Sequence, residues 1–196
     1  MKKLIGLTGK TGAGKSTVSE YLSKKGAYII DGDTVARTVL DTDKTLLPKL
    51  CDAFGNILHE DGTLDRKKLA ATAFVTPENT DLLNSIMHPA INSAIRNEVK
   101  TAFGSNDVVV VDAAAIIESG FADECDVLIT VHAPVSVRKE RIMARDNLSC
   151  EDALVRINGQ KDDAFYISKA DYVIKNYAPF VLSEEIATVE KEIFNR

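Results

Sequence analysis

Short apolar runs recur along this chain, and the segments between them carry apolar residues at helical spacing. The runs lie at residues 4–7, 27–31, 107–112, 126–131 and 170–176. Strands that are covered on both faces of a parallel sheet have continuous apolar runs, and these five match that pattern. Because they alternate with helical segments, we expect an α/β fold, a three-layer αβα sandwich around a parallel sheet of about five strands.

The connection between the second and third expected strands is the longest in the chain. Apolar residues recur at helical spacing in residues 44–54, 65–74 and 78–103, and Pro89 should kink or restart the last of these helices. Such a connection is too long for a simple crossover. We therefore expect residues 45–103 to form an inserted helical lobe that binds a substrate.

Two further segments complete the expected organisation. Residues 134–169 should contain two helices with a basic face, and residues 180–196 should form an amphipathic helix. A chain of 196 residues suits a single α/β domain. Its expected parts are a core (1–44, 104–133 and 170–196), the helical lobe (45–103) and a small helical lid (134–169).

The first strand runs directly into residues 9–16, GKTGAGKS, which match the P-loop pattern G-x-x-x-x-G-K-[ST]. Glycines let consecutive N–H groups turn inward around a phosphate, and the helix that follows directs its positive end at the same anion. Lys15 should reach the β- and γ-phosphates, and the Ser16 hydroxyl should bind Mg²⁺. The complete motif in its strand–loop–helix context disfavours a chance glycine-rich turn. The residues expected to bind ATP here are Gly12, Ala13, Gly14, Lys15, Ser16 and Thr17.

Acidic residues follow two of the expected strands. Asp31 and Asp33 end the second strand, and Asp112 ends the third in the manner of a Walker-B carboxylate. Ligands bind at the carboxyl ends of strands in open α/β sheets. If the second strand and the P-loop strand share a sheet, Asp31 and Asp33 are near the mouth of the P-loop, and we expect the two strands to lie side by side. Asp112 can hold Mg²⁺ directly or through water. A helix cap is the open alternative for Asp31 and Asp33.

Basic residues gather in the expected lid segment. Arg141 and Arg145 are four residues apart and share one helical face, and Ser149-x-x-Asp152 resembles a capping box that opens the next helix. Phosphoryl transfer needs cations around the γ-phosphate, which a basic helical lid would supply. A solvated basic face remains the alternative for this segment taken alone.

Charge and cysteine content restrict the partners and the compartment. A net charge of −5 gives no general support for a nucleic-acid surface, and the most apolar run, residues 108–117, is too short to span a bilayer. Cys51, Cys125 and Cys150 are far apart, which disfavours a disulfide scaffold or zinc site and fits a reducing cytosol. The first strand leaves no room for a signal peptide. We expect a cytoplasmic monomer or small homo-oligomer without membrane or nucleic-acid partners.

Four motifs accompany the P-loop in a defined order. They are DGDTVAR at 31–37, DGTLDRKKL at 61–69, LNSIMHP at 83–89 and ADYVIKN at 170–176. With the shorter stretches ESG, RIMAR and NGQ, they resemble the landmarks of the dephospho-CoA kinase family, in the nucleoside-monophosphate-kinase branch of P-loop proteins. The D-x-D-x-x-A-R signature is the most telling of them, and the likeness covers most of the chain.

The chain departs from the family's pattern at three places. Lys10 stands where the family usually has Gly, and Arg138 stands where Gln is common. Residues 113–117, AAAII, replace the familiar V-P-L-L-F/V. These changes are expected to soften the wall of the substrate pocket and to leave the phosphate chemistry untouched.

The resemblance implies a reaction and a set of roles. ATP would phosphorylate the ribose 3′-hydroxyl of dephospho-CoA, giving CoA and ADP in the final step of CoA biosynthesis. Asp33 would act as the base or orienting group at this hydroxyl. Arg37 and the helical lobe, including His88, would contact the CoA side. The remaining residues that it implies for catalysis or ATP binding are Lys15, Arg141, Arg145 and, near the adenine, Asn176.

Three other classes of P-loop protein are alternatives to this function. Another small-molecule kinase on the same core, such as an adenylate, shikimate or uridine kinase, is disfavoured by the D-x-D-x-x-A-R and H-P motifs. A GTPase or an ABC-type module is disfavoured because no N/T-K-x-D motif is present and residues 157–160 only faintly resemble the ABC signature. A nucleotide sensor without catalysis remains open, since Asp33 could be only a helix cap.

Overall fold

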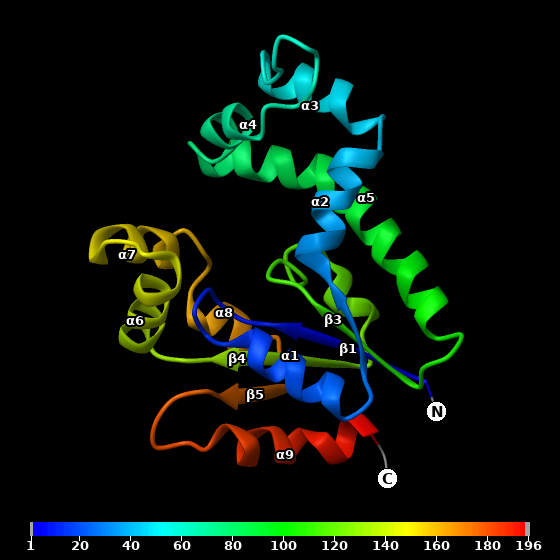
Figure 1. Cartoon of the computed structure of the whole chain (residues 1–196), viewed down its shortest axis with the longest axis vertical. Coiled ribbons are helices and arrows are strands. Elements are labelled where there is room, and N and C mark those ends of the chain that lie inside the picture. The colour runs from blue at the N-terminus through cyan, green and yellow to red at the C-terminus, as the bar shows by residue number, and fades with distance from the viewer. Residues whose placement is uncertain (1, 195–196) are drawn as a thin grey trace. The chain divides into compact units, whose positions relative to one another are not determined.

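The computed structural model describes residues 2–194, and within them five strands form one sheet (Figure 1). The strands are β1 (Lys3–Thr8), β2 (Tyr28–Asp31), β3 (Val108–Asp112), β4 (Val127–His132) and β5 (Tyr172–Lys175). Their order is β2-β3-β1-β4-β5, and every neighbouring pair is parallel. The five-stranded parallel sheet expected from the apolar runs is confirmed.

One expectation about the sheet is wrong. The second strand does not lie beside the P-loop strand, because β3 pairs with β1 on one side and with β2 on the other. Four of the five residues of β3 are buried, as the continuous run of valines requires, and this strand takes the more central place. The register aligns Leu7 of β1 with Asp112, and Asp112 with Asp31 of β2.

Nine α-helices connect and cover the strands within the described residues. They are α1 (Lys15–Lys24), α2 (Gly32–Thr42), α3 (Leu46–Phe54), α4 (Arg66–Ala73), α5 (Pro77–Ala102), α6 (Val135–Asp146), α7 (Cys150–Asn158), α8 (Asp163–Ile167) and α9 (Leu182–Phe194), with a 3₁₀ helix at Phe121–Glu124. The helix α5 does not restart at Pro89, which lies inside it. A proline removes one hydrogen bond of the helix, and the long apolar pattern on both sides sustains the rest.

The chain divides into two compact units. The sheet unit comprises the residues up to Gly32 together with those from Glu98 onward, and the helical unit comprises Asp33–Asn97. Each unit buries its own apolar residues. In the helical unit these include Leu46, Leu50 and Leu69, which belong to α3 and α4.

The core of the sheet unit is layered. Ile5 and Leu7 of β1 pack with Val18 of α1 and Ile186 of α9, so these two helices cover one face of the sheet (Figure 1). His132 of β4 points to the opposite face, where its Nδ1 atom lies 4.0 Å from a carboxylate oxygen in α8. Helices therefore cover both faces, and the expected αβα layering is confirmed.

Gly6 shows how closely the second face is packed. A Cβ atom at this position would lie 2.8 Å from Leu128 Cδ1 and 3.1 Å from Ile116 Cδ1. Side chains from β4 and from the segment after β3 thus fill the space above β1. A residue larger than glycine would displace them, since interiors pack without spare volume.

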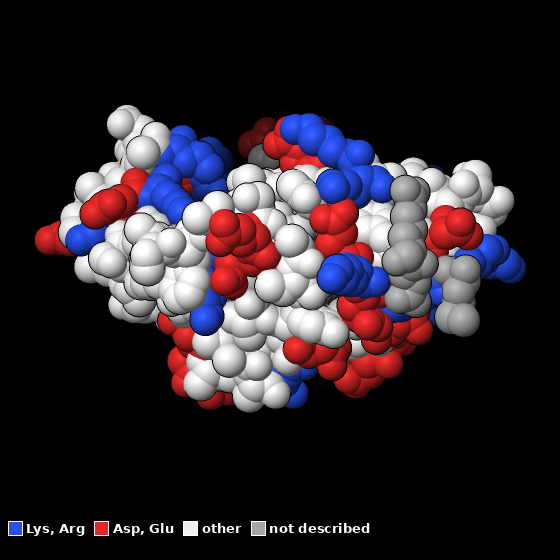
Figure 2. Space-filling view, turned by 90° about the horizontal axis from the view of Figure 1, so that it is seen from below, with Lys and Arg blue, Asp and Glu red and all other residues white. Residues whose placement is uncertain are grey.

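The surface carries charges of both signs. On the face drawn in Figure 2, acidic and basic side chains are interspersed, and the described residues there form no continuous basic area. This pattern agrees with the net charge of −5. Within residues 2–194, no helix combines the length and the apolar character that crossing a membrane requires.

Candidate functional site

The P-loop lies between β1 and α1, and its glycines are required by its backbone. Gly9, Gly12 and Gly14 have φ angles of 145°, 78° and 97°, which residues with a Cβ rarely adopt. At Gly9 a Cβ atom would also lie 2.5 Å from the Val131 carbonyl oxygen. Gly14 precedes α1 and has no side chain with which to cap it. No side chain at this position therefore caps the first turn of α1, and a helix N-terminus of this kind can bind a phosphate.

The carboxyl ends of β1 and β3 bring a lysine and an aspartate together. Lys15 Nζ lies 3.8 Å from Asp112 Oδ1, and both side chains are mostly buried. Ser16 and Thr17, which follow Lys15 in α1, are exposed. The register also aligns Asp31 with Asp112 on the neighbouring strand. The P-loop edge of the sheet thus presents a cation, hydroxyl groups and carboxylates at one place.

Arg141 of α6 binds the P-loop itself. Its Nη1 atom donates to the carbonyl oxygens of Gly12 at 3.3 Å and Ala13 at 3.2 Å, and its Nη2 atom donates to the Asn176 carbonyl at 2.9 Å. The side-chain amide of Asn176 donates to the Ala13 carbonyl at 2.8 Å. These bonds tie the P-loop to α6 and to Asn176, the residue that follows β5.

Arg145, one turn after Arg141, has a different partner. It donates to both carboxylate oxygens of Asp146, at 2.7 and 2.8 Å, and Arg156 of α7 pairs with the same carboxylate. Hydrogen bonding to Asp146 raises the pKa of Arg145, and the hydrogen bond from Arg145 lowers the pKa of Asp146. The helices α6 and α7 also share a small apolar core formed by Ile142, Ala153 and Ile157.

Several contacts of the P-loop were missed by sequence reasoning. The Thr11 N–H group donates to Gln160 Oε1 at 2.8 Å, and Lys10 Nζ lies 3.9 Å from Asp163 Oδ1. Arg138, which also pairs with Asp163, is fully buried. Gln160 belongs to the NGQ landmark, whereas Asp163 belongs to no motif that could have indicated it.

The other candidate residues lie in the helical unit. Asp33 is exposed in the first turn of α2, and Arg37 follows it by four residues, so the two share one helical face. Arg37 Nη2 donates to Thr34 Oγ1 at 3.0 Å. His88 is half-buried in α5. Since α2 begins at Gly32, Asp31 holds the position before the helix, which a capping residue would occupy.

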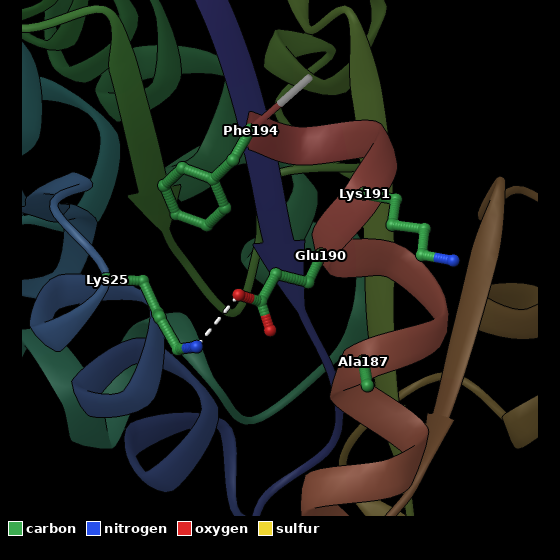
Figure 3. Close-up of a pocket in the computed structure, with 5 residues that line it drawn as sticks. All are labelled: Lys25, Ala187, Glu190, Lys191 and Phe194. Atoms are coloured by element: carbon green, nitrogen blue, oxygen red, sulfur yellow. Dashed lines mark ion pairs between the residues drawn. The ribbon is translucent and has the colours of Figure 1, made fainter. Parts of the chain in front are cut away.

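A separate pocket of about 340 Å³ lies between the end of α1 and α9 (Figure 3). Its lining residues are Lys25, Ala187, Glu190, Lys191 and Phe194. An ion pair between Lys25 Nζ and Glu190 Oε1, at 2.9 Å, joins the two helices. None of the lining residues belongs to the P-loop or to the other candidate positions, so this pocket is not part of the candidate site.

Comparison with known proteins identifies relatives that match most of the chain. A family model described as dephospho-CoA kinase matches residues 3–180. A dephospho-CoA kinase from Corynebacterium jeikeium is 42% identical over 173 residues, covering 88% of this chain and 89% of the relative. One from Bacteroides fragilis is 36% identical over 172 residues, covering 88% of this chain and 83% of the relative.

Solved structures agree with these relatives. A dephospho-CoA kinase from Campylobacter jejuni has a TM-score of 0.70 at 28% identity, covering 100% of this chain and 99% of that chain. A Thermus thermophilus protein reaches 0.80 at 27% identity, covering 99% and 97%. A shikimate kinase from Acinetobacter baumannii has a TM-score of 0.56 at 14% identity, covering 100% and 96%, which shows a shared fold alone.

Proposed function

We infer the reaction from one premise, that this chain belongs to the dephospho-CoA kinase family. It transfers the γ-phosphoryl group of ATP to the ribose 3′-hydroxyl of dephospho-CoA and releases CoA and ADP, the final step of CoA biosynthesis. The observation that carries this conclusion is the match of the family model over residues 3–180, which includes the P-loop and the helical unit.

The P-loop edge is proposed to hold the phosphates of ATP. Lys15 would neutralise charge on the transferring phosphoryl group, since such sites work mainly by positioning and electrostatic stabilisation. Arg141 binds the carbonyl oxygens of Gly12 and Ala13, and we propose that it thereby holds the P-loop in place for the phosphates. Asn176 joins the same network, and we assign it to the adenine side of the nucleotide.

The residues at this edge fit Mg²⁺. The ion prefers oxygen ligands and keeps several waters, and it is commonly bound through one or two carboxylates plus substrate phosphates. Ser16 offers an exposed hydroxyl, and Asp112 offers a carboxylate at the end of β3. Within residues 2–194, no three acidic, histidine or cysteine side chains gather into a cage made by protein alone. Ser16 and Asp112 would hold the ion, which when bound neutralises phosphate charge.

The helical unit is proposed to receive the acceptor. Asp33 would orient the 3′-hydroxyl and accept its proton as the bond to phosphorus forms. Arg37, on the same face of α2, and His88 in α5 would contact dephospho-CoA. A lobe of residues 45–103 for this substrate and a lid of residues 134–169 are parts of the same proposal. The three free cysteines support a reducing cytoplasm, and we expect a monomer or small homo-oligomer that binds no nucleic acid.

Arg145→Ala is expected to lower kcat more than it weakens ATP binding. We propose that Arg145 exchanges Asp146 for the equatorial oxygens of the phosphoryl group, which carry charge in the transition state. Steady-state kinetics and ATP titration separate the two effects. Arg145→Lys is the matched control, because it keeps the charge without the bidentate geometry. Its kcat should fall between those of wild type and Arg145→Ala. An equal loss of affinity with unchanged kcat would limit Arg145 to ground-state binding.

An acceptor panel tests the reaction. ADP release is measured with dephospho-CoA, adenosine and shikimate as acceptors, in the presence of Mg²⁺. We expect kcat/KM to be highest for dephospho-CoA, and the product to carry one additional phosphate at the 3′ position. Phosphorylation of adenosine or shikimate far better than dephospho-CoA would contradict the proposed acceptor, although ATP binding by the P-loop would stand.

A further inference from the structure

A cluster of charges, in which two buried cations meet a carboxylate that is one third exposed, lies against the first half of the P-loop. The carboxylate of Asp163, at the start of α8, accepts from Arg138 Nη2 at 3.2 and 3.3 Å. Lys10 Nζ lies 3.9 Å from the same carboxylate, and His132 Nδ1 lies 4.0 Å from it. Side chains from the P-loop, β4 and α6 therefore meet at one acidic side chain of α8.

The charges of this cluster are not balanced pair by pair. Arg138 is fully buried and Lys10 is 9% exposed. Burial lowers the pKa of His132, so its imidazole is neutral at neutral pH. Two buried cations thus share the carboxylate of Asp163. The Nε and Nη1 atoms of Arg138 are buried without a hydrogen-bond partner among the described residues. Among the described residues, the ion pair that compensates the positive charge of Arg138 is the one with Asp163.

Three consecutive P-loop residues depend on the same surroundings. Lys10 pairs with Asp163, and the Thr11 N–H group donates to Gln160, three residues before Asp163. Gly12 lies directly against the backbone of Arg138, where a Cβ atom would be 2.7 Å from the Arg138 carbonyl oxygen. Residues 10–12 of the P-loop therefore pack against the segment before α8 and the first half of α6.

Loss of the Asp163 charge would act on the loop more than on the rest of the sheet unit. Desolvation lowers the pKa of Lys10 first, and repulsion from Arg138 lowers it further, whereas Asp163 and, to a smaller extent, Asp162 oppose both effects. Without the carboxylate, two like charges would remain buried side by side, which is unfavourable. Movement of Lys10 toward solvent would relieve the repulsion, because it belongs to a loop, whereas Arg138 is enclosed in a helix. That movement would displace residues 10–12.

We propose that Asp163 is a positioning residue for ATP: it holds Lys10 and Arg138 together and thereby keeps residues 10–12 of the P-loop in the conformation that binds phosphate. The proposal rests on the proposed binding of ATP by this loop. Asp163 acts through Lys10 and Arg138 and needs no contact with the nucleotide. Lys15 and Ser16 belong to α1 and lie outside the cluster, so the chemical step should be affected less than binding.

Asp163→Asn tests this role, because it keeps the size of the side chain and removes its charge. The Kd of the non-hydrolysable analogue AMP-PNP with Mg²⁺, measured by calorimetry, should rise about tenfold if the competent loop is populated about one tenth of the time. The value of kcat at saturating ATP should stay within about threefold of wild type. Asp163→Glu, which keeps the charge, should restore most of the affinity.

Two further variants separate positioning from a general structural effect. Asp162→Asn is the matched control, since the exposed Asp162 acts on Lys10 more weakly than Asp163 does and caps α8 through Phe165 N–H, where asparagine caps equally well. Its Kd should stay within about twofold of wild type. In the Arg138→Gln background one of the two cations is absent, so adding Asp163→Asn should raise Kd by about threefold or less.

The outcomes are distinct. An unchanged Kd in Asp163→Asn, or a loss of kcat with normal Kd, would overturn the proposal. A tenfold rise in Kd on adding Asp163→Asn to Arg138→Gln would also overturn it, because the effect would not depend on the second cation. If Asp163→Asn alone does not fold, the proposal is tested by comparing the Kd of Arg138→Gln with the Kd of the Arg138→Gln and Asp163→Asn double variant. Failure of the double variant to fold where Arg138→Gln folds would contradict the charge balance. If wild type did not phosphorylate dephospho-CoA, the proposed function would fail, and the Kd comparison would still be informative.

Discussion

Lys15→Ala should reduce turnover by about 100-fold or more while leaving the protein folded, a magnitude typical of removing one preorganised charge from a transition state. Lys15 is the P-loop lysine, and its ammonium lies 3.8 Å from Asp112 at the edge of the sheet where the phosphates are proposed to bind. Its side chain is mostly buried but ends in this polar site and is not part of the apolar core, so alanine should leave the core intact. ADP production with dephospho-CoA, measured beside the thermal unfolding transition, checks both statements.

Lys24→Ala is the matched control for this experiment. Lys24 is in the last turn of the same helix, is 73% exposed and pairs with Glu20 on the surface, where such pairs contribute little to stability. Its turnover should match wild type. Near-normal ADP production by folded Lys15→Ala would contradict the assignment of the P-loop as the site of phosphoryl transfer.

Asp33→Asn should slow turnover by about 10²- to 10⁴-fold, the range expected when a positioned general base is lost. A ribose hydroxyl holds its proton tightly at neutral pH, and a carboxylate can orient it and accept that proton. Because the transition state of phosphoryl transfer is loose, part of the effect should come from alignment. Asparagine retains the size of the side chain, so binding of ATP and of dephospho-CoA should remain close to wild type. Single-turnover kinetics and equilibrium titrations of both substrates provide the measurement.

The stability of Asp33→Asn distinguishes catalysis from capping. Asp33 is in the first turn of α2, where a negative charge interacts favourably with the helix dipole by about 0.3–1 kcal/mol, so a small loss of stability is expected. Asp41→Asn is the control on the same helix, since Asp41 is exposed and pairs with Arg66 on the surface. If Asp33→Asn unfolds at a much lower temperature but keeps normal activity per folded molecule, the carboxylate serves only the helix.

Elements with a strong local pattern could be predicted from the sequence. The continuous valines of β3 indicate a strand buried on both faces, and Val108–Asp112 has this burial. Glycine is required at Gly9, Gly12 and Gly14 because these positions have positive φ. The glycine positions in the sequence of the P-loop therefore indicate its backbone conformation. Ser149 caps α7 by accepting from Asp152 N–H at 3.1 Å, as its spacing predicted.

Short or tertiary features could not be predicted in this way. The five residues of α8 are too few to show a helical period, and Phe121–Glu124 has the same limitation. The order of strands depends on where the long connection after β2 returns to the sheet, and no local pattern specifies that β3 enters between β2 and β1. The helix α5 likewise continues through Pro89, because helical residues on both sides of the proline maintain it, although proline by itself predicts a kink or a break.

By itself, the sequence determined which residues could carry the chemistry, because backbone conformation at glycines and the periodicity of apolar residues are local properties of the chain. Only the tertiary structure decided their partners. Arg141 and Arg145 share a helical face in the sequence, yet one binds the P-loop carbonyls and the other binds Asp146. Asp163 has no motif at all, and it becomes significant because folding buries two cations beside it. Charge compensation between distant segments depends on burial, which is a property of the assembled fold.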